Sequence, residues 1–170
     1  MTSPLDTGNR WAVLGVTLFV LGCAGVIADR APAAVLVNES PSLPMGIYIR
    51  AFGTAPESGS VVTVPQPASV RAYLAHLGMP DDVRLIKRVA ATAGDPICAV
   101  DDHMVLPDRI VRVRRKDRQG VPLPAWVGCR RLGPGELFLL GDTPSSFDSR
   151  YFGPVRDDQV EGVFKEVLTW

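Results

Sequence analysis

This sequence has few histidines and cysteines and no excess of either charge, and each of these features argues against a class of function. Eighteen Lys and Arg residues face 18 Asp and Glu residues, so the formal net charge is zero and no nucleic-acid partner is indicated. The three cysteines lack the clustered spacing of a zinc site, and we predict no metal and no cofactor. The only two histidines, His76 and His103, lie outside any segment that looks like a site, which disfavours a histidine-activated nucleophile.

One long apolar run supplies much of the hydrophobic content, which is 46% of the chain. Residues 11–28 carry no charge, and as a helix they would extend about 27 Å, close to the hydrocarbon thickness of a bilayer. A cleaved signal peptide and a buried core helix are the alternatives, but cleavable signals usually have a shorter apolar region and a more basic start. We therefore predict a short tail over residues 1–10, an uncleaved transmembrane helix over residues 11–28 and a folded domain over residues 31–170.

The remainder of the chain predicts a mainly β domain with one short helix. Residues 67–77 predict the helix, because Pro67 suits a first turn, apolar residues recur at helical spacing and Gly78 follows. No internal repeat or low-complexity tract is present. Short apolar or β-branched runs separated by turn residues predict strands over residues 35–37, 46–50, 60–64, 84–91, 97–100, 103–106, 109–113 and 136–140.

The cysteines leave one question open in the folded domain. Cys23 lies in the apolar run and is interpreted as a small hydrophobic residue. Cys98 and Cys129, 31 residues apart, would pair in an oxidising compartment and stay free in a reducing one. A disulfide closing a loop of this size would stabilise the fold by about 3 to 4 kcal/mol in the chain-entropy picture.

A basic cluster interrupts the otherwise balanced charge of the domain. It is interpreted as a solvated hairpin edge that its charges protect, with contact to anionic lipid as the alternative. The cluster consists of Arg109, Arg112, Arg114, Arg115, Lys116 and Arg118.

A serine segment just beyond the apolar run is the first candidate for chemistry. Pro41 and Pro44 bracket Ser42 and favour stiff, extended backbone on either side of its hydroxyl. Gly46 then permits a turn or a close backbone approach. Ordinary turn chemistry produces the same pattern, so this segment alone does not decide the function.

A serine hydroxyl is a poor nucleophile until a neighbouring base takes its proton. Lys87 lies in an otherwise apolar strand and could act as that base if burial lowers its pKa well below about 10.4. The alternative is a solvated lysine on an edge strand. A third segment, residues 141–155, packs several polar side chains between apolar neighbours, which indicates a self-satisfied network that could pin a turn or orient a lysine.

Together, three ordered segments resemble the boxes of the type I signal peptidase family. The first is Ser42-Leu-Pro with Ser40 upstream, the second Lys87-Arg88-Val89 followed by Gly94-Asp95, and the third Gly141-Asp142 with Ser146, Asp148, Ser149 and Arg150. Asn38 with Ser42-x-Pro44-x-Gly46-x-Tyr48, and the run over residues 146–155, resemble more narrowly the TraF-type branch from conjugative transfer systems. The likeness covers essentially the whole chain and implies a signal-peptidase-like antiparallel β domain behind a single N-terminal anchor.

Two departures from the housekeeping enzymes favour the TraF-type branch. Leu43-Pro44 replaces their longer Ser-Met-x-Pro, and the last box is one residue shorter, with Thr143-Pro144-Ser145 where they carry Asn-Arg. The housekeeping substrate rules therefore transfer less well to this chain.

The resemblance also implies a role for each matching residue. Ser42 would be the nucleophile and Lys87 the general base. The backbone N–H of Ser42 and the hydroxyl of Ser40 would stabilise the oxyanion. Ser146 would hydrogen-bond the lysine, and Asp148 and Arg150 would form a supporting ion pair with a structural role.

We predict a membrane-anchored serine endopeptidase, single-pass in the inner membrane, with its catalytic domain on the periplasmic side. Its partners would be the lipid bilayer and an exported precursor polypeptide, most simply a conjugative pilin subunit. The resemblance also allows an amine to intercept the acyl-enzyme, which would give a cyclic product. The alternatives are a housekeeping signal (leader) peptidase and a non-catalytic membrane-anchored β module of a secretion channel.

Overall fold

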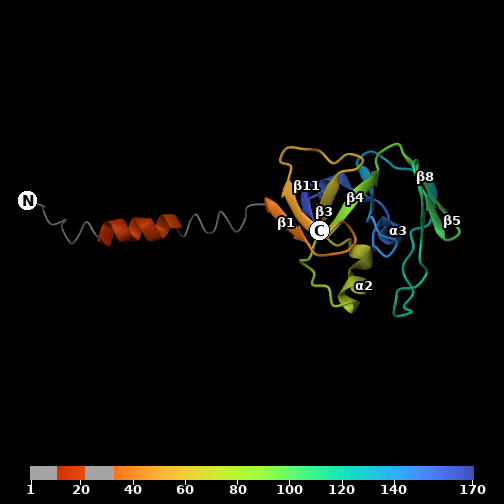
Figure 1. Cartoon of the computed structure of the whole chain (residues 1–170), viewed down its shortest axis with the longest axis horizontal. Helices are drawn as coiled ribbons and strands as arrows, with labels where there is room; N and C mark the ends of the chain where they lie inside the picture. The colour runs from red at the N-terminus through yellow and green to blue at the C-terminus, as the bar shows by residue number, and fades with distance from the viewer. Residues whose placement is uncertain (1–10, 22–32) are drawn as a thin grey trace, which may run out of the picture. The chain divides into compact units, whose positions relative to one another are not determined.

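The structure, a computed structural model, describes residues 11–21 and 33–170 (Figure 1). Residues 11–21 are helical. Within the described ranges, no helix combines the length and the apolar character needed to cross a membrane. The predicted tail over residues 1–10 and the rest of the predicted span, including Cys23, lie outside the described residues. Ala34–Trp170 form a compact unit of their own, distinct from Met1–Ala33.

The main sheet carries the candidate serine and lysine. In the described part of the chain it has seven strands, paired antiparallel in the order β1-β2-β11-β3-β4-β9-β10. The strands are β1 (Val35–Asn38), β2 (Gly46–Arg50), β3 (Val61–Val64), β4 (Leu85–Ala91), β9 (Glu136–Leu140), β10 (Val155–Arg156) and β11 (Gly162–Thr169). The prediction of a mainly β, antiparallel domain is confirmed.

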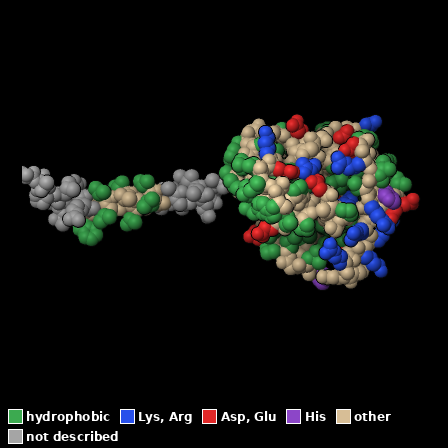
Figure 2. Space-filling view, viewed as in Figure 1, with side chains coloured by type: hydrophobic (Ala, Val, Ile, Leu, Met, Phe, Trp, Pro, Cys, Tyr) green, Lys and Arg blue, Asp and Glu red, His purple; other side chains and the backbone are tan. Residues whose placement is uncertain are grey.

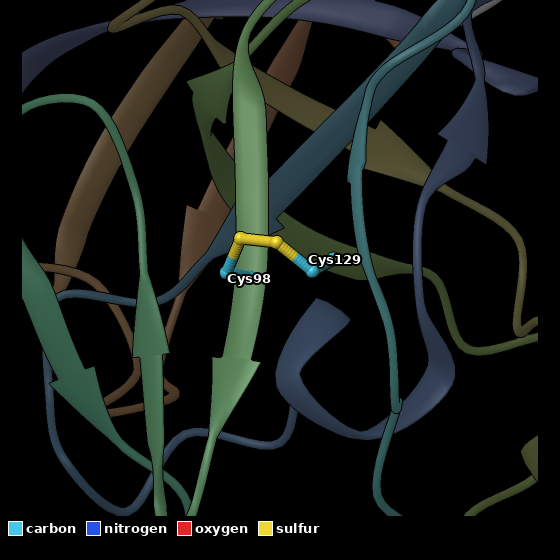
Figure 3. Close-up of a disulfide and its surroundings, with 2 residues drawn as sticks. All are labelled: Cys98 and Cys129. Atoms are coloured by element: carbon cyan, nitrogen blue, oxygen red, sulfur yellow. A yellow bond between two sulfur atoms is a disulfide. The ribbon is translucent and has the colours of Figure 1, made fainter.

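A second, smaller sheet contains the two cysteines of the domain. Its order is β7-β6-β5-β8, and its strands are β5 (Pro96–Val100), β6 (His103–Val105), β7 (Ile110–Arg112) and β8 (Cys129–Arg131). Cys98 on β5 lies opposite Cys129 on β8, and a disulfide joins them (Figure 3). The bond therefore ties β8, which follows a long loop, to the centre of this sheet.

The helices are short, and the prediction of one short helix is wrong. The segment expected to be helical contains a 3-10 turn, η1 (Ala68–Val70), followed by α2 (Arg71–His76). A further helix, α3 (Ser149–Phe152), begins after Asp148, whose carboxylate accepts the backbone N–H of Arg150. Four residues are too few for helical periodicity to appear in the sequence. A second 3-10 turn, η2 (Asp157–Gln159), precedes β11.

Strand β4 is an interior strand, and this position determines the environment of Lys87. It pairs with β3 on one side and β9 on the other, with Lys87 opposite Val62. Since side chains alternate along a strand, Lys87 shares a face with Leu85 and Val89, which belong to the largest apolar core. The alternative of a solvated edge-strand lysine is therefore wrong.

The basic cluster lies on the surface of the domain, and its six side chains are exposed. Figure 2 shows Lys and Arg side chains gathered at the lower right of the domain, where the teal chain that leads to β8 runs in Figure 1. Two members form exposed ion pairs, Arg109 with Asp108 and Arg112 with Asp102. This arrangement fits the solvated-edge interpretation, and contact with anionic lipid stays a prediction.

Candidate active site

The candidate serine lies in the loop that joins β1 to β2, and Asn38 at the end of β1 holds this loop. The Asn38 side-chain amide donates to the carbonyl oxygens of Ser40, Leu43 and Pro44 at 3.0, 3.2 and 3.0 Å. Its Oδ1 accepts the backbone N–H of Ser40 at 3.0 Å. Asn38 is buried, so one side chain supplies hydrogen bonds that water cannot supply to the inside of the loop.

Hydrogen bonds from Tyr48 and Asp142 also hold the serine loop. The Tyr48 hydroxyl donates to the carbonyl of Pro44 at 2.6 Å, and the backbone N–H of Asp142 donates to the carbonyl of Ser42 at 2.6 Å. At Gly46 a Cβ would overlap the carbonyl oxygen of Leu168 on β11. The expected close backbone approach at this glycine is therefore present.

Lys87 on β4 and Ser42 in the β1–β2 loop lie within hydrogen-bond distance, although β11 and β3 separate β2 from β4 in the sheet. Lys87 Nζ lies 3.1 Å from Ser42 Oγ and donates to the carbonyl of Ile86 at 2.9 Å. Lys87 is 5% exposed and Ser42 is 7% exposed. Burial lowers the pKa of the Lys87 amine to about 8; the Asp148 carboxylate acts in the opposite direction, and the Arg150 guanidinium lowers the pKa further.

The two expected oxyanion donors also lie in this loop. Ser40 Oγ is 3.1 Å from Ser42 Oγ and accepts the Ser42 backbone N–H at 3.3 Å. In this conformation the donors are engaged with each other. A substrate oxygen would have to replace Ser40 Oγ at the Ser42 N–H, while the exposed Ser40 hydroxyl turns toward the same oxygen.

Asp148 and Arg150 form a buried ion pair that supports the turn next to the serine loop. Arg150 Nε and Nη2 donate to the two oxygens of Asp148 at 2.8 and 2.7 Å. Arg150 also donates to the carbonyls of Thr143 and Ser146, and Asp148 accepts the backbone N–H of Gly141 at 2.9 Å. The ion pair thus fixes the turn over residues 141–146. Asp142 in this turn donates its backbone N–H to the serine loop.

Ser146 differs from what the family resemblance implies. Lys87 Nζ donates to Ser42 and Ile86, and within the described residues Ser146 Oγ has no hydrogen-bond partner. The expected lysine-orienting hydrogen bond is therefore not formed in this conformation. Ser146 Oγ instead lies against Gly141, where a Cβ would overlap it. Only glycine at position 141 leaves room for this side chain.

A cavity of about 230 Å³ opens between these groups. Ser42, Lys87 and Ser146 line it together with apolar side chains such as Met79, Ile86 and Phe147. A hydroxyl beside a buried amine of lowered pKa, with N–H and O–H groups close by that could donate to an oxyanion, is an arrangement suited to acyl transfer. Among the described residues, no group of His, Cys, Asp and Glu side chains could hold a metal ion.

Comparison with known proteins identifies the family. The family model described as signal peptidase, peptidase S26, matches residues 9–170. The chain belongs to the peptidase S26 family. Within it, relatives support the TraF-type branch: a plasmid transfer protein TraF from Escherichia coli is 30% identical, covering 92% of each chain. A conjugal transfer protein TraF from Agrobacterium tumefaciens is 33% identical, covering 90% of this chain and 95% of the relative.

Among solved structures, a signal peptidase I from Enterococcus faecalis aligns with this S26 chain. The TM-score is 0.38 and the identity is 22%, and the alignment covers 65% of this chain and 97% of that structure.

One group of charged side chains beside the site of this S26 chain, Arg88 with Asp142 and Glu166, was not predicted from the sequence. Arg88, the neighbour of Lys87, donates to both carboxylate oxygens of Asp142 at 3.1 and 3.0 Å and to Glu166 on β11 at 2.7 Å. The hydrogen bond to Asp142, opposed by burial and assisted by Glu166, raises the Arg88 pKa. The Lys87-Arg88 and Gly141-Asp142 pairs are visible in the sequence. No local pattern indicates that Arg88 contacts Asp142 and Glu166, which lie 54 and 78 positions further along the chain.

Proposed function

We propose that this chain is a membrane-anchored serine endopeptidase with Ser42 as nucleophile and Lys87 as general base. One observation carries the proposal. The Lys87 amine lies 3.1 Å from the Ser42 hydroxyl, in surroundings where burial lowers its pKa to about 8. A lysine with this pKa is partly neutral near neutral pH, so it has a lone pair available for the serine proton.

In the acylation step, neutral Lys87 takes the proton of Ser42 as Oγ bonds to the substrate carbonyl carbon. The carbonyl oxygen becomes an oxyanion, which the Ser42 N–H and the Ser40 hydroxyl stabilise. One such donor typically lowers the barrier by about 3 to 4 kcal/mol. Protonated Lys87 then gives its proton to the leaving amine, and an acyl ester remains on Ser42.

The second step repeats this proton transfer with a new nucleophile. Lys87 removes a proton from water, the water oxygen attacks the ester carbon, and the Ser42 oxygen leaves and recovers its proton. An amine of the substrate can replace water in the same geometry, and the product is then a cyclic peptide. Mass spectrometry distinguishes the two outcomes, because hydrolysis adds the mass of one water and cyclisation does not.

The proposed substrate is an exported precursor of a conjugative transfer system, most simply a pilin subunit. Support comes from the relatives named as plasmid and conjugal transfer proteins. Residues 11–28 would anchor the enzyme in the inner membrane with its catalytic domain in the periplasm, in agreement with their uncharged apolar sequence. A housekeeping leader peptidase would instead process generic preproteins as readily as the pilin precursor, and parallel assays separate the two.

The test compares wild type with Ser42→Ala and Lys87→Ala variants in cleavage of the pilin precursor. Both variants should lose cleavage while circular dichroism shows the domain still folded. Full activity of the folded lysine variant would refute the Ser/Lys dyad. A serine-directed acylating inhibitor should label Ser42 in wild type, and failure to label it would favour a non-catalytic β module.

A further inference from the structure

A second cavity, of about 340 Å³, adjoins the one that contains Ser42 and Lys87. It lies between α2, the loop over residues 114–123 and the turn before α3. Pro41, Ser145 and Phe147 line both cavities, and Pro41 immediately precedes Ser42. A polypeptide bound at Ser42 can therefore place a side chain in the second cavity only a few residues from the bond that is cut.

Three aromatic side chains, those of Tyr73, Phe147 and Tyr151, form one part of the wall of this second cavity. The ring of Phe147 stacks on Tyr151 with centroids 5.1 Å apart, and its centroid lies 5.1 Å from that of Tyr73. Leu77 and Leu123 add aliphatic surface. The volume lies near the lower end of the range for small-ligand sites, which suits one large apolar or aromatic side chain.

Two polar groups in the wall of this cavity, the Tyr73 hydroxyl and the Asp117 carboxylate, already have partners. The Tyr73 hydroxyl donates to Asp117 Oδ2 at 3.1 Å, and Asp117 Oδ1 accepts the backbone N–H groups of Gln119 and Val121. The Asp117 carboxylate is thereby tied to its own loop. It helps to fix the shape of the cavity, and the aromatic and leucine side chains are left as the apolar surface for a bound side chain.

Two arginines at the edge of the cavity carry charge without an acidic partner. Arg114 and Arg118 line the cavity and are exposed. In the part of the chain that the structure describes, neither guanidinium forms an ion pair, whereas Arg109 and Arg112 of the same cluster do. A carboxylate beside the bound apolar side chain would meet these two positive charges.

We propose that the second cavity is a specificity subsite for the polypeptide substrate. It would bind a large apolar or aromatic side chain with its ring against Tyr73 and Phe147, and Arg114 and Arg118 would pair with an adjacent acidic residue. The inference rests on the proposed function, because it assigns the occupant to the polypeptide that Ser42 cleaves.

Binding to the full-length protein in detergent micelles tests the subsite without requiring catalysis. The probe is a fluorescein-labelled, alanine-rich peptide with a central Phe-Asp pair. Its binding is measured by fluorescence anisotropy. Replacing both arginines, Arg114→Glu with Arg118→Glu, should weaken binding about tenfold, because two attractions become repulsions. A Phe-Lys peptide should show the reverse preference and bind the double variant more tightly than wild type.

Lys116→Glu is the matched control, since this exposed lysine lies in the same loop but does not line the cavity. The affinity of the Lys116→Glu variant for the Phe-Asp peptide should stay within about twofold of the wild-type affinity, as expected for an exposed charge without a partner. Equal affinities for wild type and the double variant would overturn the proposal. So would an equally large loss with Lys116→Glu, which would indicate a general charge effect.

A second readout connects the cavity to Ser42. The bound Phe-Asp peptide should slow acylation of Ser42 by a fluorescent serine-directed probe in wild type. Binding that leaves the acylation rate unchanged would refute a substrate subsite. If Ser42 is not acylated even without peptide, the nucleophile assignment fails, while the anisotropy comparison still decides whether the two arginines recognise the peptide.

Discussion

Wild-type protein should gain stability relative to a Lys87→Met variant as the pH rises from 7 to 10. Burial lowers the folded-state pKa of Lys87 to about 8, whereas an unfolded chain has a lysine pKa of about 10.4. The folded state therefore binds fewer protons than the unfolded state between these values. Stability rises with pH in this window and is lost as the pH falls through 8.

The size of the effect follows from the two pKa values. A difference of about 2.4 units at 1.36 kcal/mol each means that burying the protonated amine costs about 3 kcal/mol at low pH. About 2.5 kcal/mol of this is recovered between pH 7 and pH 10. The hydrogen bonds that methionine cannot make to Ser42 and Ile86 add an offset of about 1 kcal/mol each, which depends little on pH.

The assay is urea unfolding of both full-length proteins in detergent at several pH values, followed by tryptophan fluorescence. Subtracting one free energy of unfolding from the other cancels the titration of every other group. Lys165→Met, at an exposed position on β11, is the control, and its difference from wild type should stay constant. A constant difference for Lys87→Met as well would refute a buried lysine of lowered pKa.

Three further outcomes are expected. Precursor cleavage should rise about tenfold per pH unit below pH 8 and level off above it, because only neutral Lys87 accepts the Ser42 proton; a flat profile from pH 6 to pH 10 would contradict the general base. Asn38→Ala should slow acylation of Ser42 by a serine-directed probe about tenfold or more with the fold retained, since three loop carbonyls lose their donor; an unchanged rate would show that the loop holds without it. Replacing Cys98 and Cys129 by serine should lower the free energy of unfolding by about 3 to 4 kcal/mol, measured by urea unfolding, and an equal stability would contradict the bond.

Local sequence patterns predicted the strands that carry their own boundary signals. The strands over residues 46–50 and 136–140 begin and end where expected, because glycine or proline lies near their ends. Strands β8 and β10 have three and two residues, too short for an alternating pattern. Their existence depends on neighbours that the local sequence does not contain.

The candidate site divides in the same way. The motifs pointed to Ser42 and Lys87, but the choice between a buried and an edge lysine depended on β3 and β9, which are remote in sequence. The function of Asn38 in holding the loop requires the three-dimensional path of residues 39–45. The orientation of Ser146 is a matter of side-chain rotamer, on which the sequence is silent.

The hydrogen bond from the backbone N–H of Asp142 to the carbonyl of Ser42 has a consequence for when the serine loop reaches its folded conformation. Residues near position 42 are made early in synthesis, whereas the turn that supports them belongs to the last quarter of the chain. Such long-range contacts form only after the intervening loop closes. An incomplete chain therefore has Ser42 without the turn that holds its carbonyl, and the proposed nucleophile is positioned only once the last quarter of the chain has folded onto it.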